Sequence, residues 1–147
     1  MVTGPLGADL LAVVARLNRL ASQRARLPLP FAQGRLLSTI EDQGAARISD
    51  LAALDHCSQP TMTMQVRRLE DAELVSRTVD PDDARAVLIR ITDKGVDVLR
   101  QVRLDRGAAI DPYLERLDDA DRQTLQGAVE VMRKLLDDAS VPKQSVK

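Results

Sequence analysis

Aromatic, cysteine and histidine side chains are nearly absent from this sequence. It contains one Phe, one Tyr, no Trp, one Cys and one His. Its core must therefore be built from aliphatic residues, which favours helices. Cys57 has no second cysteine with which to form an intramolecular disulfide. With His56 it supplies too few ligands for a metal site, which needs three or four, so we expect no metal and no cofactor.

Long apolar runs and blocks of one charge are also missing. No apolar stretch approaches the roughly 18 residues that span a bilayer, and the first residues lack the basic region of a signal peptide. We therefore predict a cytoplasmic protein that does not enter membranes. The chain carries 21 Lys and Arg against 22 Asp and Glu, a net charge of −1. A nucleic acid would have to be contacted by a few placed arginines, because there is no general positive field.

The residues needed for catalysis are equally scarce. One His and one Cys cannot provide a nucleophile, a base and an orienting group. A redox switch would need a resolving thiol or a low-pKa setting for Cys57, and neither is visible. The paired carboxylates fall in expected turns and at helix ends, where Asp is common: Asp82/Asp83, Asp118/Asp119 and Asp137/Asp138. The sequence predicts that this chain is not an enzyme.

The spacing of apolar residues predicts six helices and one β-hairpin. We expect helices over about 9–26, 31–42, 48–55 and 59–72, then one from Thr92 that bends or restarts near Pro112, and a last one from Asp118. Strands are expected over 74–79 and 87–92, joined by the seven-residue loop DPDDARA. The length of 147 residues fits one domain or one protomer of an oligomer.

The middle of the chain has the order of a winged helix-turn-helix: a short helix, a tight turn, a second helix and a two-stranded ribbon. Ser58 is a plausible N-cap of the second helix, and Pro60 falls in its first turn. One face of this helix is apolar, at Met62, Val66 and Leu69. The other is polar and cationic and could enter the major groove of DNA. Arg85 is the only cation of the following loop and suits a narrow minor groove.

The segment from Arg67 to Gly95, RRLEDAELVSRTVDPDDARAVLIRITDKG, resembles the MarR family of bacterial transcription regulators. DPDDAR matches the Asp-Pro-x-Asp-x-Arg pattern of that family's wing, and ITDKG matches its Thr-x-x-Gly step into the next helix. The resemblance covers nearly the whole chain. It implies a mostly α fold with a small β-hairpin wing. We expect one protomer over 1–147, with a DNA-binding lobe at 31–95 and dimerisation helices at 6–26 and 100–140.

The resemblance also implies the partner and the roles of residues. The chain is expected to be a homodimeric repressor on a roughly palindromic double-stranded operator, with half-sites about 10 to 10.5 base pairs apart. In the wing, Arg85 would be the tip arginine and Asp83 the residue that orders the loop, with Arg68 and Arg77 in the same network. The major-groove face would comprise Ser58, Gln59, Pro60, Thr61, Thr63, Met64 and Arg67.

Two positions depart from the family pattern. Glu73 stands where the family usually has Gly after the recognition helix, which makes a left-handed helix end costlier. Met64 stands where a polar or basic residue often contacts a base, so we expect an apolar contact there, for example with a thymine methyl group.

A small, often aromatic or anionic effector is a further implication of the resemblance. Its expected site lies between the dimer helices and the DNA-binding lobe, with a lining from Leu17, Phe31, Leu36, Ile40 and Leu99. An alternative interpretation is a protein-interaction module that uses the same fold but does not bind DNA, which the net charge of −1 keeps open. For Arg85 the alternative is a weak surface ion pair with Asp83.

Overall fold

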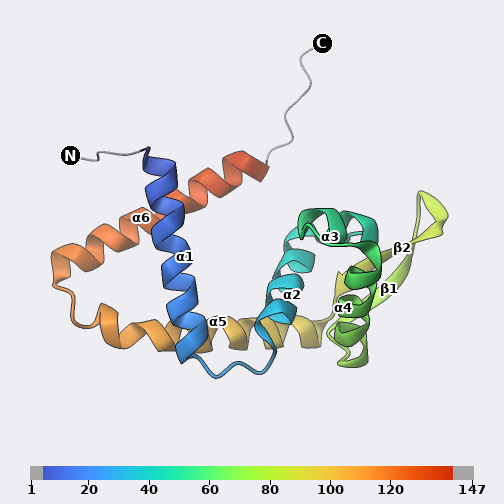
Figure 1. Cartoon of the computed structure of the whole chain (residues 1–147), viewed down its shortest axis with the longest axis horizontal. Coiled ribbons are helices and arrows are strands. Elements are labelled where there is room, and N and C mark those ends of the chain that lie inside the picture. Colours follow the sequence, from blue (N-terminus) through green and yellow to red (C-terminus); the bar gives the residue numbers. More distant parts are fainter. Residues whose placement is uncertain (1–4, 141–147) are drawn as a thin grey trace, which may run out of the picture. The chain divides into compact units, whose positions relative to one another are not determined.

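The computed structural model describes residues 5–140, and Figure 1 shows its elements in chain order. The chain divides into two compact units, one up to Ala109 and one from Ile110. The first unit contains α1 (Leu6–Arg24), α2 (Phe31–Gln43), α3 (Ile48–Leu54), α4 (Gln59–Asp71), β1 (Val75–Asp80) and β2 (Asp83–Ile91). It also holds most of α5 (Asp93–Leu114), and the second unit holds the end of α5 and α6 (Asp119–Ser140). The predicted six helices and antiparallel hairpin are confirmed.

The hydrophobic core lies in the first unit, where α2, α3, α4 and β2 meet. Its largest fully buried side chains are Leu37, Ile40, Leu51, Met62, Leu69, Ile89 and Val66. Met62, Val66 and Leu69 are spaced four and three residues apart, so they share the inner face of α4. The opposite face of that helix therefore stays outside. Of the helices described here, none is long and apolar enough to cross a membrane.

Helix α4 ends in a Schellman motif without glycine. Glu73 adopts a left-handed φ of 61°, and its N–H donates to the carbonyl of Glu70 at 2.8 Å. The N–H of Leu74 donates to the carbonyl of Leu69 at 2.9 Å, and both of these leucine side chains are buried. The helix end is thus left-handed despite the departure from Gly at position 73, and the motif's own hydrogen bonds and apolar contact offset its cost.

The turn between α3 and α4 is built in the same way. His56 has a φ of 51°, its N–H donates to the carbonyl of Ala53 at 3.3 Å, and that of Cys57 donates to the carbonyl of Ala52 at 3.0 Å. This second Schellman motif sets the direction in which the chain enters α4.

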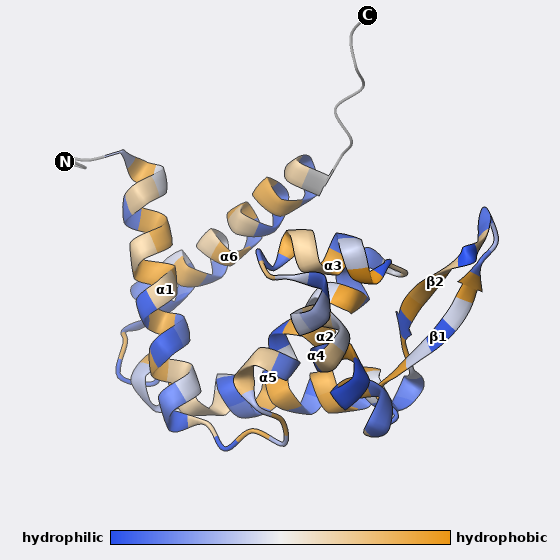
Figure 2. Ribbon diagram, turned by 45° about the vertical axis from the view of Figure 1, so that its right-hand side comes forward, coloured by the Kyte–Doolittle hydropathy of each residue, from blue (hydrophilic) through white to orange (hydrophobic). Residues whose placement is uncertain are grey.

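The hairpin departs from the predicted loop. Only Pro81 and Asp82 lie between the strands, so the expected seven-residue loop is wrong. The regular register ends at Val79 opposite Val87, and Asp80 then pairs with Asp83, so residues 84–86 bulge from β2. At the other end of the hairpin, the backbone of Ala46 exchanges two hydrogen bonds with that of Ile89, at 3.1 and 2.8 Å. The hairpin extends beyond α3 and α4, and its turn is hydrophilic (Figure 2).

A glycine joins the end of α4 to the start of α5. The Thr92 side chain donates to the carbonyl of Glu73 at 2.7 Å and accepts from the N–H of Gly95 at 3.0 Å. A Cβ at position 95 would lie 2.2 Å from the carbonyl oxygen of Leu74. The Thr-x-x-Gly step is therefore a close backbone contact that no larger residue permits. From there α5 runs without interruption through Pro112.

Candidate nucleic-acid interface

The start of α4 is fixed by its own cap. Ser58 Oγ accepts a hydrogen bond from the Thr61 N–H at 3.3 Å and donates to Thr61 Oγ1 at 2.9 Å. Pro60 occupies the first turn, where a missing N–H costs little. Of the predicted contact residues, Ser58 and Thr61 are thus already bonded to each other.

The rest of the predicted major-groove face lies on the outer side of α4. Gln59, Met64 and Arg67 are exposed, and Thr63 is half-buried. Met64 is 52% exposed, so its apolar side chain is accessible to a partner. Within residues 5–140, neither Arg67 nor the exposed Arg68 has a side-chain hydrogen bond or an ion pair. Both positive charges are therefore available to a partner.

Arg85 lies at the tip of the hairpin, in the bulge of β2. Its side chain is 94% exposed, and its Nε lies 3.5 Å from Asp83 Oδ1. The same oxygen accepts a hydrogen bond from the backbone N–H of Arg85 at 3.0 Å. Asp83 therefore shapes the bulge, while the Arg85 guanidinium faces solvent with most of its donors free.

Arg77 is occupied at the base of the hairpin. Its Nε donates to Glu70 Oε1 on the last turn of α4. This ion pair ties β1 to α4, and it includes neither Asp83 nor Arg85. Arg68, which was expected in the wing network, is not in contact with Asp83 or Arg85 through any hydrogen bond or ion pair of the described residues.

A second carboxylate, Asp80, connects the wing to the body of the protein, and sequence reasoning missed it. Asp80 Oδ2 accepts from Nε and Nη2 of Arg47, at 3.0 and 2.6 Å, and Oδ1 accepts from the Asp82 N–H at 2.9 Å. The backbone N–H of Asp82 and the Arg47 guanidinium hold the pKa of Asp80 below its usual range. The hydrogen bond to Asp80 likewise raises the pKa of Arg47.

A signal for this pair was present in the sequence. The loop DPDDARA has three carboxylates and one arginine, so at least one carboxylate had to find a cation elsewhere or remain solvated. Nothing in the local pattern identified Arg47 as that cation, because it lies 33 positions earlier in the chain.

The turn between α3 and α4 holds the two residues that were considered for a metal or redox site. His56 is exposed and Cys57 half-buried. No cluster of three or more metal-ligating side chains occurs among the residues that the structure describes. Asp55, at the end of α3, pairs with Arg35 of α2.

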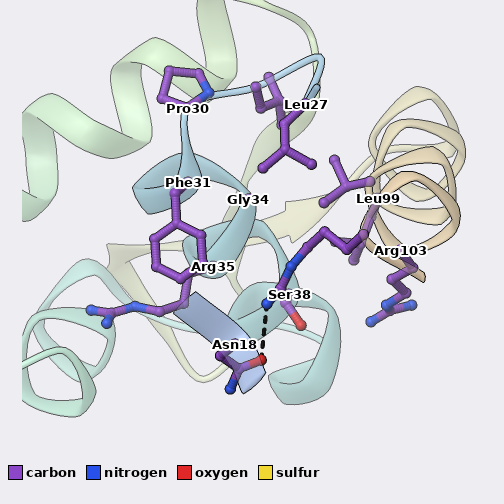
Figure 3. A pocket seen from close by; sticks show the side chains of 12 residues that line it. Asn18, Leu27, Pro30, Phe31, Gly34, Arg35, Ser38, Leu99 and Arg103 are labelled. Carbon is purple, nitrogen blue, oxygen red and sulfur yellow. Dashed lines mark hydrogen bonds between the residues drawn. The ribbon is translucent and has the colours of Figure 1, made fainter. Parts of the chain in front are cut away.

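A cavity of about 210 Å³ lies in the first unit between α2, α5 and the segment that follows α1 (Figure 3). Of the residues predicted to line an effector site, Phe31 and Leu99 line this cavity. Leu36 and Ile40 lie in the core instead, and Leu17 lines a separate depression on α1. The arginines around the cavity are Arg35, Arg103 and Arg106.

Arg106 is held tightly at this cavity. Its Nη2 donates to Asn18 Oδ1 at 2.9 Å, and its guanidinium carbon lies 5.7 Å from the centre of the Phe31 ring. Its Nε is buried and has no hydrogen-bond partner among the described residues. Arg103 and Arg35, in contrast, already pair with Glu41 and Asp55.

Comparison with known proteins agrees with this geometry. The sequence model of the MarR family matches residues 29–87. The HTH-type transcriptional regulator Mb0904 of Mycobacterium bovis is 29% identical over 135 residues, which cover 91% of this chain and 94% of that protein. A solved structure of the multiple antibiotic resistance repressor MarR superposes with a TM-score of 0.69 at 24% identity, covering 88% of this chain and 95% of the other.

A further solved structure is that of a mutant MarR from E. coli complexed with operator DNA, with a TM-score of 0.59 at 23% identity and coverage of 87% of this chain and 93% of that one. Structural likeness at these identities shows the fold, and the sequence matches show similarity to regulators of the helix-turn-helix type. The relatives are named as regulators, which confirms the prediction that the chain is not an enzyme. Residues 29–87 thus match the MarR family model, and the chain as a whole shares the winged helix-turn-helix fold of the MarR structures.

Proposed function

We propose that this chain is a cytoplasmic, sequence-specific DNA-binding repressor that acts as a homodimer on a roughly palindromic operator. The observation that carries the proposal is the pairing of two free cationic surfaces: the outer face of α4 and the tip of the hairpin. Arg67 and Arg85 project from them with donors not used within the described chain.

The two surfaces suit the two grooves of a duplex. An α-helix fits the major groove, where Gln59, Thr63 and Arg67 can donate to or accept from base edges and Met64 can contact a thymine methyl group. Arg85 at the end of a narrow ribbon can enter the flanking minor groove, whose negative potential attracts a lone arginine. Because the wing loop is otherwise acidic, DNA contact there depends on Arg85.

Dimerisation is supported by apolar side chains left exposed on the terminal helices. On α1, Leu11 is 70% exposed and Val13 is 56% exposed; on α6, Leu125 and Val129 are each more than 40% exposed. A second copy of the chain would bury such surfaces. It would also supply the second recognition helix that a palindromic site requires.

The proposal is tested by selecting bound sequences from a random duplex DNA pool, and then titrating the recovered duplex by fluorescence anisotropy at several salt concentrations. We expect a palindrome with half-sites about one helical turn apart, and an affinity that falls steeply with salt because phosphate contacts release counterions. A folded dimer that enriches no sequence and shows no salt dependence would instead favour the protein-interaction module.

Two kinds of substitution separate positioning from base reading. Arg85→Ala should weaken binding to every duplex and reduce the salt slope, whereas changes at Thr63 or Gln59 should alter which sequence is preferred. Arg100→Gln is the matched control for lost charge, because Arg100 lies on α5 and pairs only weakly with Asp97, at 3.7 Å. Equal binding by the Arg85→Ala variant and the wild type across the salt series would remove the wing from the interface.

The cavity at Arg106 is the proposed site of a small anionic effector. Its volume of about 210 Å³ is below the roughly 300–1,000 Å³ of sites for drug-sized ligands, so the ligand must be small. A carboxylate there would satisfy the buried Arg106 Nε, and the apolar part of the ligand would contact Phe31 and Leu99. Such a ligand releases DNA only if it prefers a conformation that binds the operator poorly.

Benzoate is a suitable probe for this site, because it combines a carboxylate with a small apolar ring. We expect millimolar benzoate to raise the melting temperature of the free protein and to weaken operator binding, and Arg106→Gln to abolish both effects. Benzamide, which has the same ring without the charge, is the control ligand. Equal effects of the two compounds, or an unchanged response of the Arg106→Gln variant, would contradict an anion site at Arg106.

A further inference from the structure

The tip of the hairpin is not held in place by its strands alone. The regular ladder stops at Val79 and Val87, and the residues beyond it include the bulge that carries Arg85. An isolated two-stranded ribbon is marginally stable in water. The position of Arg85 must therefore depend on contacts that the backbone ladder does not provide.

Asp80 supplies such contacts at the point where the ladder fails. It is the only buried charged residue among those the structure describes, with 7% of its surface exposed. One carboxylate oxygen accepts the N–H of Asp82 inside the turn, and the other accepts two donors of Arg47. The carboxylate thus bonds at once to the wing's turn and to a residue outside the wing.

Arg47 connects this carboxylate to the helix-turn-helix. It is the N-cap residue of α3, and its backbone carbonyl accepts the first helical hydrogen bond, from the Leu51 N–H at 3.1 Å. Its neighbour Ala46 is bonded to Ile89 at the base of the hairpin. The segment 46–47 therefore contacts the wing at two points. Its backbone contacts the base of the hairpin, and the Arg47 side chain contacts Asp80 next to the turn.

We propose that Arg47 is a positioning residue for DNA recognition. Its ion pair with Asp80 holds the tip of the wing, and with it Arg85, at a fixed place relative to α3 and α4. This inference rests on the proposed function, since it assigns a role in reaching the minor groove. Arg47, without touching DNA itself, would then determine whether α4 and Arg85 can contact the major and minor grooves at the same time.

The sign of two charge changes gives the sharpest test. Asp80→Asn removes a negative charge near DNA and Arg47→Gln removes a positive one, so simple attraction to phosphate predicts opposite effects on affinity. Loss of the tether predicts that both weaken binding to the selected duplex, by about tenfold each, within the range for one lost specific contact. Asp82→Asn is the matched control: the same charge change two residues away in the same turn, on an exposed side chain.

A double-mutant cycle with Arg85 separates positioning from general stability. If Asp80 acts through Arg85, Asp80→Asn should cost no further affinity once Arg85 is already Ala. Arg47→Lys, which keeps the charge but not the two-point geometry, should restore only part of the loss. An additive cycle, or an Asp80→Asn variant that binds as tightly as the Asp82→Asn control, would overturn the positioning role.

Amide hydrogen exchange tests the tether without DNA. In the Asp80→Asn and Arg47→Gln proteins, the amides of Asp82 and of residues 84–86 should exchange faster, while those of Ala46 and Ile89 stay protected. Unchanged exchange at the tip would overturn the inference whether or not the chain binds DNA. A wild-type protein that selects no duplex would refute the proposed function and this role with it. Normal wild-type binding that the substitutions leave intact would refute only the role of Arg47.

Discussion

The winged helix-turn-helix lobe and the last helix of this chain bury their apolar residues to very different extents. In the lobe, Leu37, Leu51 and Ile89 are fully buried within the chain itself. In α6, none of the described side chains is buried, although hydrophobic and hydrophilic residues follow each other along the whole helix (Figure 2). Apolar residues therefore form a core in the lobe, whereas in α6 they remain on the surface of the single chain.

The difference indicates which region can be stable alone. Burial of a Leu or Ile side chain contributes about 1.5–3 kcal/mol, so the lobe holds its own driving force for folding. An exposed amphipathic helix gains little until its apolar side is covered. We infer that the lobe is stabilised by its core, whereas α6 would be stabilised by the second copy of the chain in the proposed homodimer.

The largest expected effect is in the lobe core. Leu69→Ala should lower the free energy of unfolding by about 2–5 kcal/mol, because a fully buried side chain leaves a cavity in a packed interior. Urea unfolding at a fixed protein concentration measures this loss. The control is Leu54→Ala, at a site that is 52% exposed, where the loss should be much smaller. Equal losses at the two sites would refute the distinction between core and surface.

The second prediction concerns α6. Leu125→Lys together with Val129→Lys should raise the dimer dissociation constant by about 100-fold, because roughly 1.5 kcal/mol of apolar burial is lost at each position. Analytical ultracentrifugation measures the dissociation constant. The circular dichroism spectrum of the chain should change little, because the lobe stays folded. Gln126→Lys, on an exposed position of the same helix, controls for added charge. A double variant that remains a dimer would place the interface elsewhere.

The third prediction uses acid. Because the pKa of Asp80 is lowered in the folded protein, its stabilising contribution is fully present above the unfolded pKa of about 3.9 and is lost as the pH falls through the lower folded value. The wild-type protein should therefore melt at a higher temperature than the Asp80→Asn variant at pH 7, and the gap should narrow below about pH 4. A gap that stays constant down to pH 2 would contradict an ionised Asp80 as its source. Asp82→Asn should show no such gap.

The smallest expected effects are at the two left-handed helix ends. Glu73→Gly and His56→Gly should each raise the free energy of unfolding by about 0.5–1 kcal/mol, because glycine removes the cost of a positive φ but loses more chain entropy on folding. Thermal melting of the single variants measures the gain. Ala53→Gly, inside α3, should instead lower stability. A loss of stability at both positions would mean that the side chains of Glu73 and His56 contribute more than the strain costs.

Much of the lobe could be predicted from the sequence, since its elements obey simple periodicities. The spacing of Met62, Val66 and Leu69 identified the inner face of α4, and Ser58 identified its start. The bounds of the helices shifted by only a few residues in the structure. Local patterns succeed there because helix formation depends mostly on neighbours three and four positions apart.

The wing tip could not be predicted in the same way. Ala84, Arg85 and Ala86 look like loop residues, but they form a bulge within β2. Next to this bulge, Asp80 is bonded to Asp82 and to the distant Arg47. The expected effector site failed in part for a related reason: Leu36 and Ile40 have the helical spacing of either a core or a cavity wall, and only tertiary packing decides between them. Long-range contacts of single side chains leave no periodic signal.

The contact at Gly95 also predicts the outcome of random mutagenesis. Every residue that a single nucleotide change can substitute for glycine carries a Cβ, and a Cβ at this position would meet the Leu74 carbonyl at 2.2 Å. A library of functional variants should therefore contain wild-type glycine at position 95 almost without exception, while exposed Gly107 and Gly127, whose Cβ positions are open, accept many residues. The contact between the end of α4 and the start of α5 would then be recognisable from the sequences of functional variants alone, as one position that does not vary.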